Sequence, residues 1–284
     1  MLEGKFLPNS SKKFSLHPYT HEVSRYRETP GKKRKVKQEL TQVFTMSNEI
    51  IVKGNPNIPN IALTFDDGPG RVTPYILDVL RKYGVRATFF CLGCCIEKNI
   101  AAQNHDSKYI TGSEIVKRAN EEGHLIAVHS YDHRALPELT DEETLNKKLT
   151  RTKNIITDLI GKTPVYFRPP YGRTDDRVNK IVKALDLKIV LWSCRSADSS
   201  TEHGIILDGS LKYKYGPTDI YNNIMRNTEN GSIILCHDGH SGTHDANFGI
   251  VSALDRAIPE LQQKGFNFVT VDELLATGNY IIRD

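Results

Sequence analysis

Residues 61–69 read IALTFDDGP, and this short stretch decides the fold. Its first five residues are apolar or β-branched, which favours a buried strand over an alternating surface strand. Asp66 and Asp67 follow directly, and Gly68 and Pro69 then turn the chain. A buried strand that ends in acidic residues is typical of the carboxyl-terminal edge of a parallel sheet, where α/β proteins place their functional groups.

The same pattern repeats along the rest of the chain. Short apolar runs alternate with segments whose apolar residues recur at helical spacing. The predicted strands are 61–65, 87–91, 125–128, 165–168, 188–192, 233–236 and 266–269. Helix starts are predicted at Thr73, Thr140, Thr174 and about Asn247, from capping residues and from the apolar periodicity that follows them. This alternation predicts an α/β fold, a (β/α) barrel of about seven strands, with an open doubly wound sheet as the alternative.

The chain of 284 residues is 38% apolar and 25% charged, which is ordinary for a globular protein. We expect one catalytic domain over residues 46–284, after a polar, basic extension over residues 1–45. No run of eighteen apolar residues is present, so no transmembrane segment is predicted, and no apolar leader follows Met1.

A basic run occupies residues 32–37 of the predicted extension. Such a run could bind nucleic acid, an anionic polymer or a transport receptor, or could be a solvated tail. No aromatic residues or nucleic-acid fold signature accompany it, so no nucleic-acid partner is predicted.

The five cysteines are odd in number and follow no regular spacing, so a disulfide scaffold is not predicted. Cys91 and Cys94 have the spacing of a redox or zinc pair, but no second pair follows. Buried free thiols are the simpler interpretation, and they are more typical of a reducing compartment.

The first candidate chemical group is the pair Asp66 and Asp67. Adjacent residues at a strand end point in different directions, so one carboxylate can bind a metal while the other accepts a proton. A surface Asp-Gly-Pro turn is the alternative interpretation.

The second group is His129 and His133, directly after the strand predicted at 125–128. Two histidines four residues apart lie on one face of a helical turn, so both rings could reach one ion. Zinc favours such nitrogen ligands with a carboxylate as the third. A chance pair of surface histidines is the alternative.

Two further clusters also follow predicted strands. In the run Arg168-Pro169-Pro170-Tyr171, two prolines stiffen the loop, and the next free N–H, that of Tyr171, suits an oxyanion donor. His237 ends the strand at 233–236 and could act as a general acid. A purely structural proline loop and a structural histidine are the alternatives.

With these four clusters in this order, residues 48–276 resemble the polysaccharide deacetylase family, which is carbohydrate esterase family 4 with the NodB-like homology domain. The match is densest over residues 61–93, which contain TFDDGP, the helix TPYILDVL and GVRATFF. The resemblance implies a distorted (β/α) barrel and a hydrolase that acts on carbon–nitrogen bonds other than peptide bonds.

The resemblance also implies roles for single residues. Asp67, His129 and His133 match the metal ligands, and the ion is expected to be Zn²⁺, with Co²⁺ or Ni²⁺ as alternatives. The catalytic residues are expected to be Asp66 as base, Arg168 as its partner, Tyr171 as oxyanion donor, His237 as acid and Asp198 as the residue that orients it. Leu235, Trp192, Tyr171 and Pro170 are expected to contact substrate.

The sequence departs from the family pattern at the fourth motif. Asp198 is followed by Ser199, where the family has tryptophan. The sugar-binding surface should therefore lack one aromatic wall. The segments 94–109 and 201–217 are also longer than is usual for the family and could reshape access to the site.

We therefore expect a metal-dependent enzyme, a monomer, that removes acetyl groups from N-acetylglucosamine units of peptidoglycan or a chitin-like polymer. The alternative is a non-catalytic glycan-binding domain of the same fold. The acetylated glycan is the expected partner. We expect a periplasmic, cell-wall or secreted location with the leader absent from this sequence, and a cytoplasmic location remains the alternative.

Overall fold

The computed structural model describes residues 49–98, 102–103, 109–207, 210–239 and 247–283. Residues Asn48–Asp284 form one compact unit. The extension predicted over residues 1–45 and its basic run lie outside the described residues. No helix in the described ranges is long and apolar enough to cross a membrane.

The described part of the chain alternates strands and helices. The strands are β1 (Ile50–Lys53), β2 (Asn60–Asp66), β3 (Thr88–Cys91), β4 (Ala102–Gln103), β5 (Tyr109–Ile110), β6 (Leu125–Val128), β7 (Tyr166–Phe167), β8 (Lys188–Val190), β9 (Cys194–Arg195), β10 (Thr201–Leu207), β11 (Ser210–Tyr213), β12 (Ile233–His237), β13 (Asn267–Phe268) and β14 (Ile281–Arg283). The α-helices are α2 (Thr73–Lys82), α3 (Gly93–Glu97), α4 (Gly112–Glu121), α5 (Glu142–Ile160), α6 (Asp176–Ala184), α7 (Pro217–Asn227), α8 (Gly249–Gln263) and α9 (Val271–Leu275). Short 3₁₀ helices lie at Leu136–Glu138 and Pro170–Gly172.

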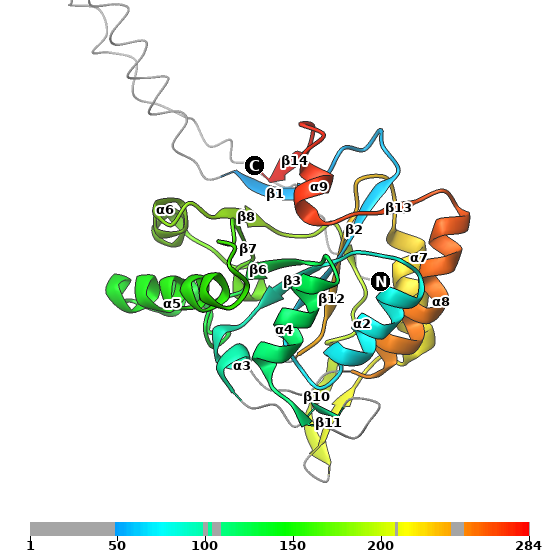
Figure 1. Cartoon of the computed structure of the whole chain (residues 1–284), viewed down its shortest axis with the longest axis horizontal. Helices are drawn as coiled ribbons and strands as arrows, with labels where there is room; N and C mark the ends of the chain where they lie inside the picture. Colours follow the sequence, from blue (N-terminus) through cyan, green and yellow to red (C-terminus); the bar gives the residue numbers. More distant parts are fainter. Residues whose placement is uncertain (1–48, 99–101, 104–108, 208–209, 240–246, 284) are drawn as a thin grey trace, which may run out of the picture. The chain divides into compact units, whose positions relative to one another are not determined.

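The main sheet has the order β14-β1-β8-β7-β6-β3-β2-β12-β9, and β13 pairs with β2. Only β14 is antiparallel to its neighbour among these pairs. The sheet curls into a half barrel, with α2, α4, α7 and α8 along its outside (Figure 1). The predicted α/β fold is confirmed as a distorted, open barrel with more strands than seven.

Strand β2 lies near the centre of the sheet, between β3 and β12. Its residues from Ile61 to Asp66 are all buried, as expected for a parallel strand that is covered on both faces. In the register with β12, His237 pairs with Asp66. The polar residues at the ends of these neighbouring strands therefore meet at one edge of the sheet.

Apolar side chains pack on both faces of the curled sheet. The larger cluster lies between the sheet and the helices and includes Phe65, Leu77 and Leu254. A smaller cluster, which includes Phe90, Val190 and Leu274, uses the alternate residues of the same strands. The two clusters hold the strand ends in fixed positions around the polar edge.

The capping positions predicted from the sequence each lie one residue away from the observed N-caps. The N-caps are Val72, Asp141, Asp175 and Phe248. In α5 the carboxylate of Asp141 accepts the N–H groups of Glu143 and Thr144, so the capping box predicted from Thr140 is wrong. Aspartate caps a helix at least as well as threonine, and its charge also favours the positive end of the helix dipole.

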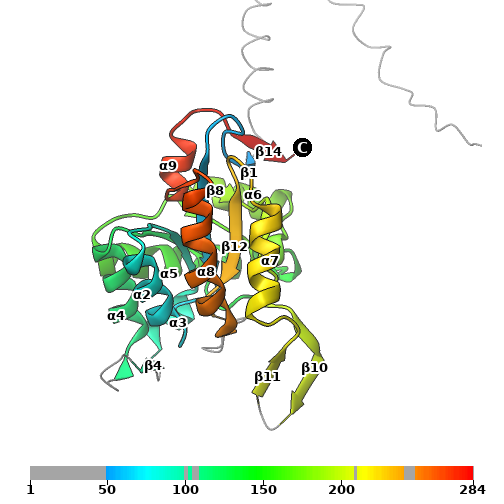
Figure 2. The ribbon, with the colours of Figure 1, turned by 90° about the vertical axis from the view of Figure 1, so that its right-hand side faces the viewer.

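The longer segments noted in the sequence form small hairpins. Strands β10 and β11 pair in an antiparallel two-stranded sheet, as do β4 and β5. Figure 2 shows the β10–β11 hairpin projecting from the body beyond the end of α7. It follows directly after the loop that carries Asp198, at the edge of the sheet where the polar clusters gather.

Candidate active site

Two carboxylates lie at the end of β2, and both are buried. The strand ends at Asp66, and Asp67 then adopts a left-handed conformation with φ of 74°. A non-glycine residue is uncommon in this region, and such residues cluster at functional sites. Asp66 lies against Arg168, whereas Asp67 lies against His129 and His133.

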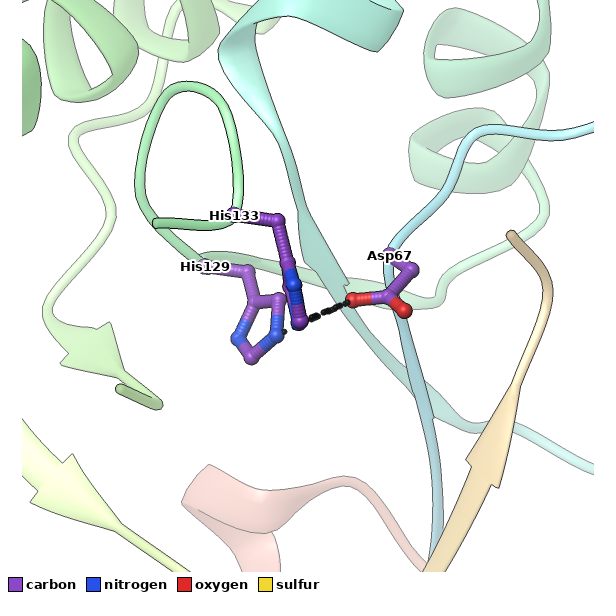
Figure 3. Close-up of side chains that lie close together, drawn as sticks. All are labelled: Asp67, His129 and His133. Carbon is purple, nitrogen blue, oxygen red and sulfur yellow. Dashed lines mark ion pairs between the residues drawn. The ribbon is translucent and has the colours of Figure 1, made fainter. Parts of the chain in front are cut away.

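The carboxylate of Asp67 faces the two histidines that follow β6 (Figure 3). Its Oδ1 lies 3.2 Å from Nε2 of His129 and 3.0 Å from Nε2 of His133. The three ligand atoms all lie within 4.8 Å of one another, and the three residues are buried. This is a possible metal site made of one carboxylate and two imidazoles.

The two histidines reach this position from a loop. No helix covers residues 129–135, so the predicted helical turn is wrong. Ser130 and His133 have φ values of 87° and 58°, and these two left-handed residues fold the loop so that both rings point at Asp67. Nδ1 of His129 lies 2.7 Å from the carbonyl oxygen of Arg168. A proton on Nδ1 can be donated to that carbonyl, which leaves Nε2 free to bind a metal.

The donor set fits a divalent cation. Burial acts to raise the pKa of Asp67, but hydrogen bonds with His129 and His133 outweigh burial and hold its pKa well below the ordinary range. Burial acts to lower the pKa of His129, yet the charges of Asp66 and Asp67 raise it. The three side chains thus favour a positive charge between them. A divalent ion that takes nitrogen and oxygen ligands supplies that charge.

Asp66 is paired with a fully buried arginine. Nη1 of Arg168 lies 2.7 Å from Oδ1 of Asp66, and neither side chain is more than 4% exposed. The remaining donors of Arg168 bond to the Thr64 hydroxyl and to the carbonyl oxygens of Val190 and Leu191. Because each nitrogen of the guanidinium is hydrogen-bonded, the pair sets the orientation of the Asp66 carboxylate.

His237, at the end of β12, is held by Asp198. Its Nδ1 lies 2.9 Å from Oδ1 of Asp198, and its backbone N–H donates to Oδ2 at 2.8 Å. Ser196 also donates to this carboxylate. Burial acts to lower the pKa of His237, but the charge and hydrogen bond of Asp198, with the charges of Asp67 and Asp66, raise it to about 9. The imidazole is therefore protonated at neutral pH and can donate from Nε2.

One cavity of about 360 Å³ is lined by both carboxylates at the end of β2, by the two histidines that face Asp67 and by His237. Its walls include the predicted contact residues Leu235, Trp192 and Tyr171. The Tyr171 ring packs edge-on against His133 at 4.6 Å, and the residue is 59% exposed. Pro170 is buried and is not among the lining residues, so it supports the loop from behind.

The loop at the fourth motif forms one side of the cavity. Ala197, Ser199 and Ser200 line it together with Arg195. Small residues thus occupy the position where the resemblance noted in the sequence predicts a second aromatic wall. The remaining tryptophan, Trp192, packs so closely on Gly172 that a Cβ there would lie 2.8 Å from its ring.

Asp238 was not singled out from the sequence. It is buried, and its Oδ2 accepts a hydrogen bond from the Thr73 hydroxyl at 2.7 Å. The same hydroxyl accepts the N–H of Gly70. Burial and the charges of Asp67 and Asp66 raise the pKa of Asp238 to about 7. These contacts join the loop after β2 to the loop after β12. The sequence signal that could have pointed to Asp238 is its position directly after His237.

The five cysteines are all buried and free, as predicted. Burial raises the pKa of the Cys91 and Cys236 thiols well above the ordinary value. These thiols are packing groups in the strands beside the cavity.

A family model described as polysaccharide deacetylase matches residues 53–190. A peptidoglycan-N-acetylglucosamine deacetylase of Bacillus cereus is 36% identical over 226 residues, which are 79% of this chain and 71% of that protein. The chain belongs to the polysaccharide deacetylase family. Asp66, Asp67, His129 and His133 all lie in the part of the chain that the family model covers.

Two further proteins resemble the chain over most of its length. The peptidoglycan-N-acetylglucosamine deacetylase PgdA of Listeria monocytogenes is 33% identical over 85% of this chain, which spans only 46% of PgdA. The chain therefore covers about half the length of that relative. The crystal structure of the Bc1960 peptidoglycan N-acetylglucosamine deacetylase in complex with 4-naphthalen-1-yl-N-oxidanyl-benzamide superimposes with a TM-score of 0.62 and 35% identity, covering 78% of this chain and 91% of that one.

Proposed function

We propose that this protein is a metal-dependent deacetylase that hydrolyses the acetamide of N-acetylglucosamine units in a polysaccharide. The observation that carries the proposal is one cavity lined by a possible metal site, by Asp66 and by His237. A metal site, a base and an acid are what hydrolysis of an amide needs within reach of one carbonyl.

Asp67, His129 and His133 would hold the metal, with Zn²⁺ the best match for two imidazoles and one carboxylate, and Co²⁺ or Ni²⁺ as alternatives. When bound, a divalent ion there would polarise the acetyl carbonyl and make a water molecule acidic enough to lose its proton near neutral pH. The remaining steps belong to groups of the protein itself.

Asp66 accepts the proton of the attacking water. Its Oδ2 is turned towards His129, 3.8 Å from Nε2, while Oδ1 is held by Arg168. One oxygen therefore faces the cavity and the other is anchored. As the water oxygen bonds to the acetyl carbon, its proton passes to the Asp66 carboxylate.

The backbone N–H of Tyr171 stabilises the oxyanion. The two prolines before it leave this N–H as the first donor of the loop, and Tyr171 has φ of 60°. Within the described part of the chain this N–H donates to no acceptor. Removing one oxyanion donor typically costs about 3 kcal/mol of transition-state stabilisation.

His237 protonates the leaving nitrogen from Nε2 as the carbon–nitrogen bond breaks. Asp198 orients the ring and keeps it protonated at neutral pH. Leu235 and Trp192 form apolar walls beside it, suited to the acetyl methyl and the sugar ring. The products are acetate and a free amino sugar.

Peptidoglycan is the proposed polymer, because the relatives of B. cereus and L. monocytogenes are named for it. A chitin-like polymer is the second choice, since a chitin deacetylase of Cryptococcus neoformans also matches 49% of this chain. Cell-wall glycans lie outside the cytoplasm, so we propose that the protein acts in the periplasm, in the cell wall or after secretion. We propose that it acts as a monomer.

The test is release of acetate from peptidoglycan, chitin oligomers and acetylated xylan, by wild type and Asp66→Asn, with and without chelator. We expect release by the zinc-loaded wild type, loss with chelator and a loss of at least about 100-fold in the variant. Glycan binding without acetate release from any substrate would instead support the non-catalytic alternative.

A further inference from the structure

A second hollow of about 600 Å³ adjoins the candidate active site. It shares Trp192 and Arg195 with the catalytic cavity and continues over the start of β9 and the end of α7. Arg226 and Glu229 are among its other lining residues. A polymeric substrate whose acetamide lies in the cavity would extend its neighbouring sugars along such a hollow.

The hollow contains two arginines that are paired with no carboxylate among the described residues. Arg195 and Arg226 are both exposed. Among the described residues, no carboxylate lies within 4.0 Å of either guanidinium, whereas Glu229 is paired with Lys53 at 2.5 Å. Stacking over the Trp192 ring, 4.9 Å from its centroid, holds the guanidinium of Arg195 beside the cavity.

The hollow that shares His133 and Tyr171 with the cavity has a different charge pattern. Its Arg173 is paired with Glu138 at 2.7 Å, and its Arg134 lies 3.5 Å from Asp132, a carboxylate that also binds Lys148 at 2.6 Å. Each arginine of that hollow thus has a carboxylate within 4.0 Å, whereas Arg195 and Arg226 have none among the described residues. The two arginines without such a partner both lie on the Trp192 side of the cavity.

We propose that the hollow lined by Arg195 and Arg226 is a subsite for a carboxylate on the sugar next to the one that is deacetylated. The inference rests on the proposed function and narrows its substrate class to anionic glycans, such as peptidoglycan strands whose muramic acid has lost its stem peptide and carries a free lactyl carboxylate, over neutral chitin or xylan. A guanidinium offers paired N–H donors that match a carboxylate, and its planar shape lets it stack on an aromatic ring at the same time.

The test compares two substrates that differ only in charge. One is the peptidoglycan tetrasaccharide of alternating N-acetylglucosamine and N-acetylmuramic acid with free lactyl carboxylates, and the other is its methyl ester. For the zinc-loaded wild type at low salt, we expect kcat/KM and the calorimetric affinity to favour the free acid by about fivefold, the size expected for exposed charge pairs. The preference should shrink at 1 M salt.

Arg195→Gln and Arg226→Gln should each lower the ratio of free acid to ester, and the double variant should bring it to about one. The single variants are measured as well as the double variant, because a loss caused by disturbed packing at Trp192 would be confined to Arg195→Gln. Arg256→Gln is the matched control, because Arg256 is also exposed and stacked on an aromatic ring, that of Tyr221 at 4.1 Å, but lines none of these hollows. It should keep the wild-type ratio.

The outcomes separate the two proposals. A wild-type ratio of one or less, or an unchanged ratio in the double variant, overturns the subsite while acetate release upholds the deacetylase. If neither substrate releases acetate but the free acid still binds about fivefold tighter, with the preference lost in the double variant, the subsite stands and the deacetylase proposal fails.

Discussion

Replacing Asp198 by asparagine should change the pH range over which the enzyme works. Asp198 supplies the negative charge and the ring hydrogen bond that hold His237 protonated. The pKa of His237 is about 9, against an ordinary value of 6.5, a difference of about 2.5. Asparagine keeps the shape of the side chain but removes the charge, so the pKa should fall towards the ordinary value.

The size of the effect follows from the contacts. Asp198 is the first of the three carboxylates that raise this pKa against the effect of burial, so its loss should lower the pKa of His237 by about one to two. Because His237 must be protonated to act as the acid, the alkaline limb of kcat/KM should move down by the same amount. Above pH 9 the variant should then be about 10- to 100-fold slower.

The assay is acetate release by the zinc-loaded protein between pH 5.5 and 10. Wild type and variant carry the same metal charge, so the difference between their profiles isolates Asp198. Asp255→Asn is a suitable control, since Asp255 pairs with Lys82 on the outer helices and should leave the profile unchanged. An alkaline limb at the same pH in wild type and Asp198→Asn would refute the assignment of His237 as the acid.

Stability gives a second measurement of the same pair. Because the folded pKa of His237 lies above its unfolded value, the pairing stabilises the fold fully below about pH 6.5. The contribution is lost as the pH rises through about 9. In metal-free protein, the difference in unfolding free energy between wild type and Asp198→Asn should therefore narrow by up to about 3 kcal/mol over this range, measured by urea denaturation.

Three further changes test the parts of the site separately. Arg168→Met should destabilise the protein by about 3–5 kcal/mol in urea denaturation, because it leaves the Asp66 charge buried without its partner, and adding Asp66→Asn should restore part of the loss. Gly68→Ala should lower the melting temperature and the activity, since the new Cβ would collide with the Asp238 carboxylate. An unchanged melting temperature would show that the loop moves to accommodate the added methyl group. Zn²⁺ should raise the melting temperature of chelator-treated wild type but not of Asp67→Ala, and an equal rise in both would place the ion elsewhere.

The long, well-buried strands of the sheet could be predicted from the sequence. The apolar run at 61–65 has no polar alternation because β2 is covered on both faces. Strand β7, although only two residues long, lies within the strand predicted at 165–168. Strand β9 was not predicted, because it follows Trp192 in a segment without a clear pattern. The antiparallel β14 depends on pairing with the distant β1, which no local pattern encodes.

The site could be anticipated because parallel strands end at one edge of a sheet. That rule alone gathers Asp67, His129 and His237 from three strands. The conformation of the histidine loop could not be read from spacing, because it depends on left-handed residues at Ser130 and His133. The spacing of four residues between the two histidines predicts a helical turn, yet a loop brings the same two rings to Asp67.

Contacts between loops that are far apart in the sequence could not be predicted either. The hydrogen bond from Thr73 to Asp238 joins residues 165 positions apart, and Thr73 had been interpreted only as a helix cap. The charge asymmetry around the cavity likewise depends on which arginines find acidic partners after folding. Arg173 does so across 35 residues, whereas Arg195 has none among the described residues.

The central claim is that one divalent ion, held by Asp67, His129 and His133, drives deacetylation. Its most direct test is to titrate chelator-treated protein with Zn²⁺ while following acetate release from peptidoglycan. We predict that the rate rises linearly and stops rising at one equivalent of metal. A rate that is already maximal in the metal-free protein, or that stays at zero through every addition, would contradict the claim.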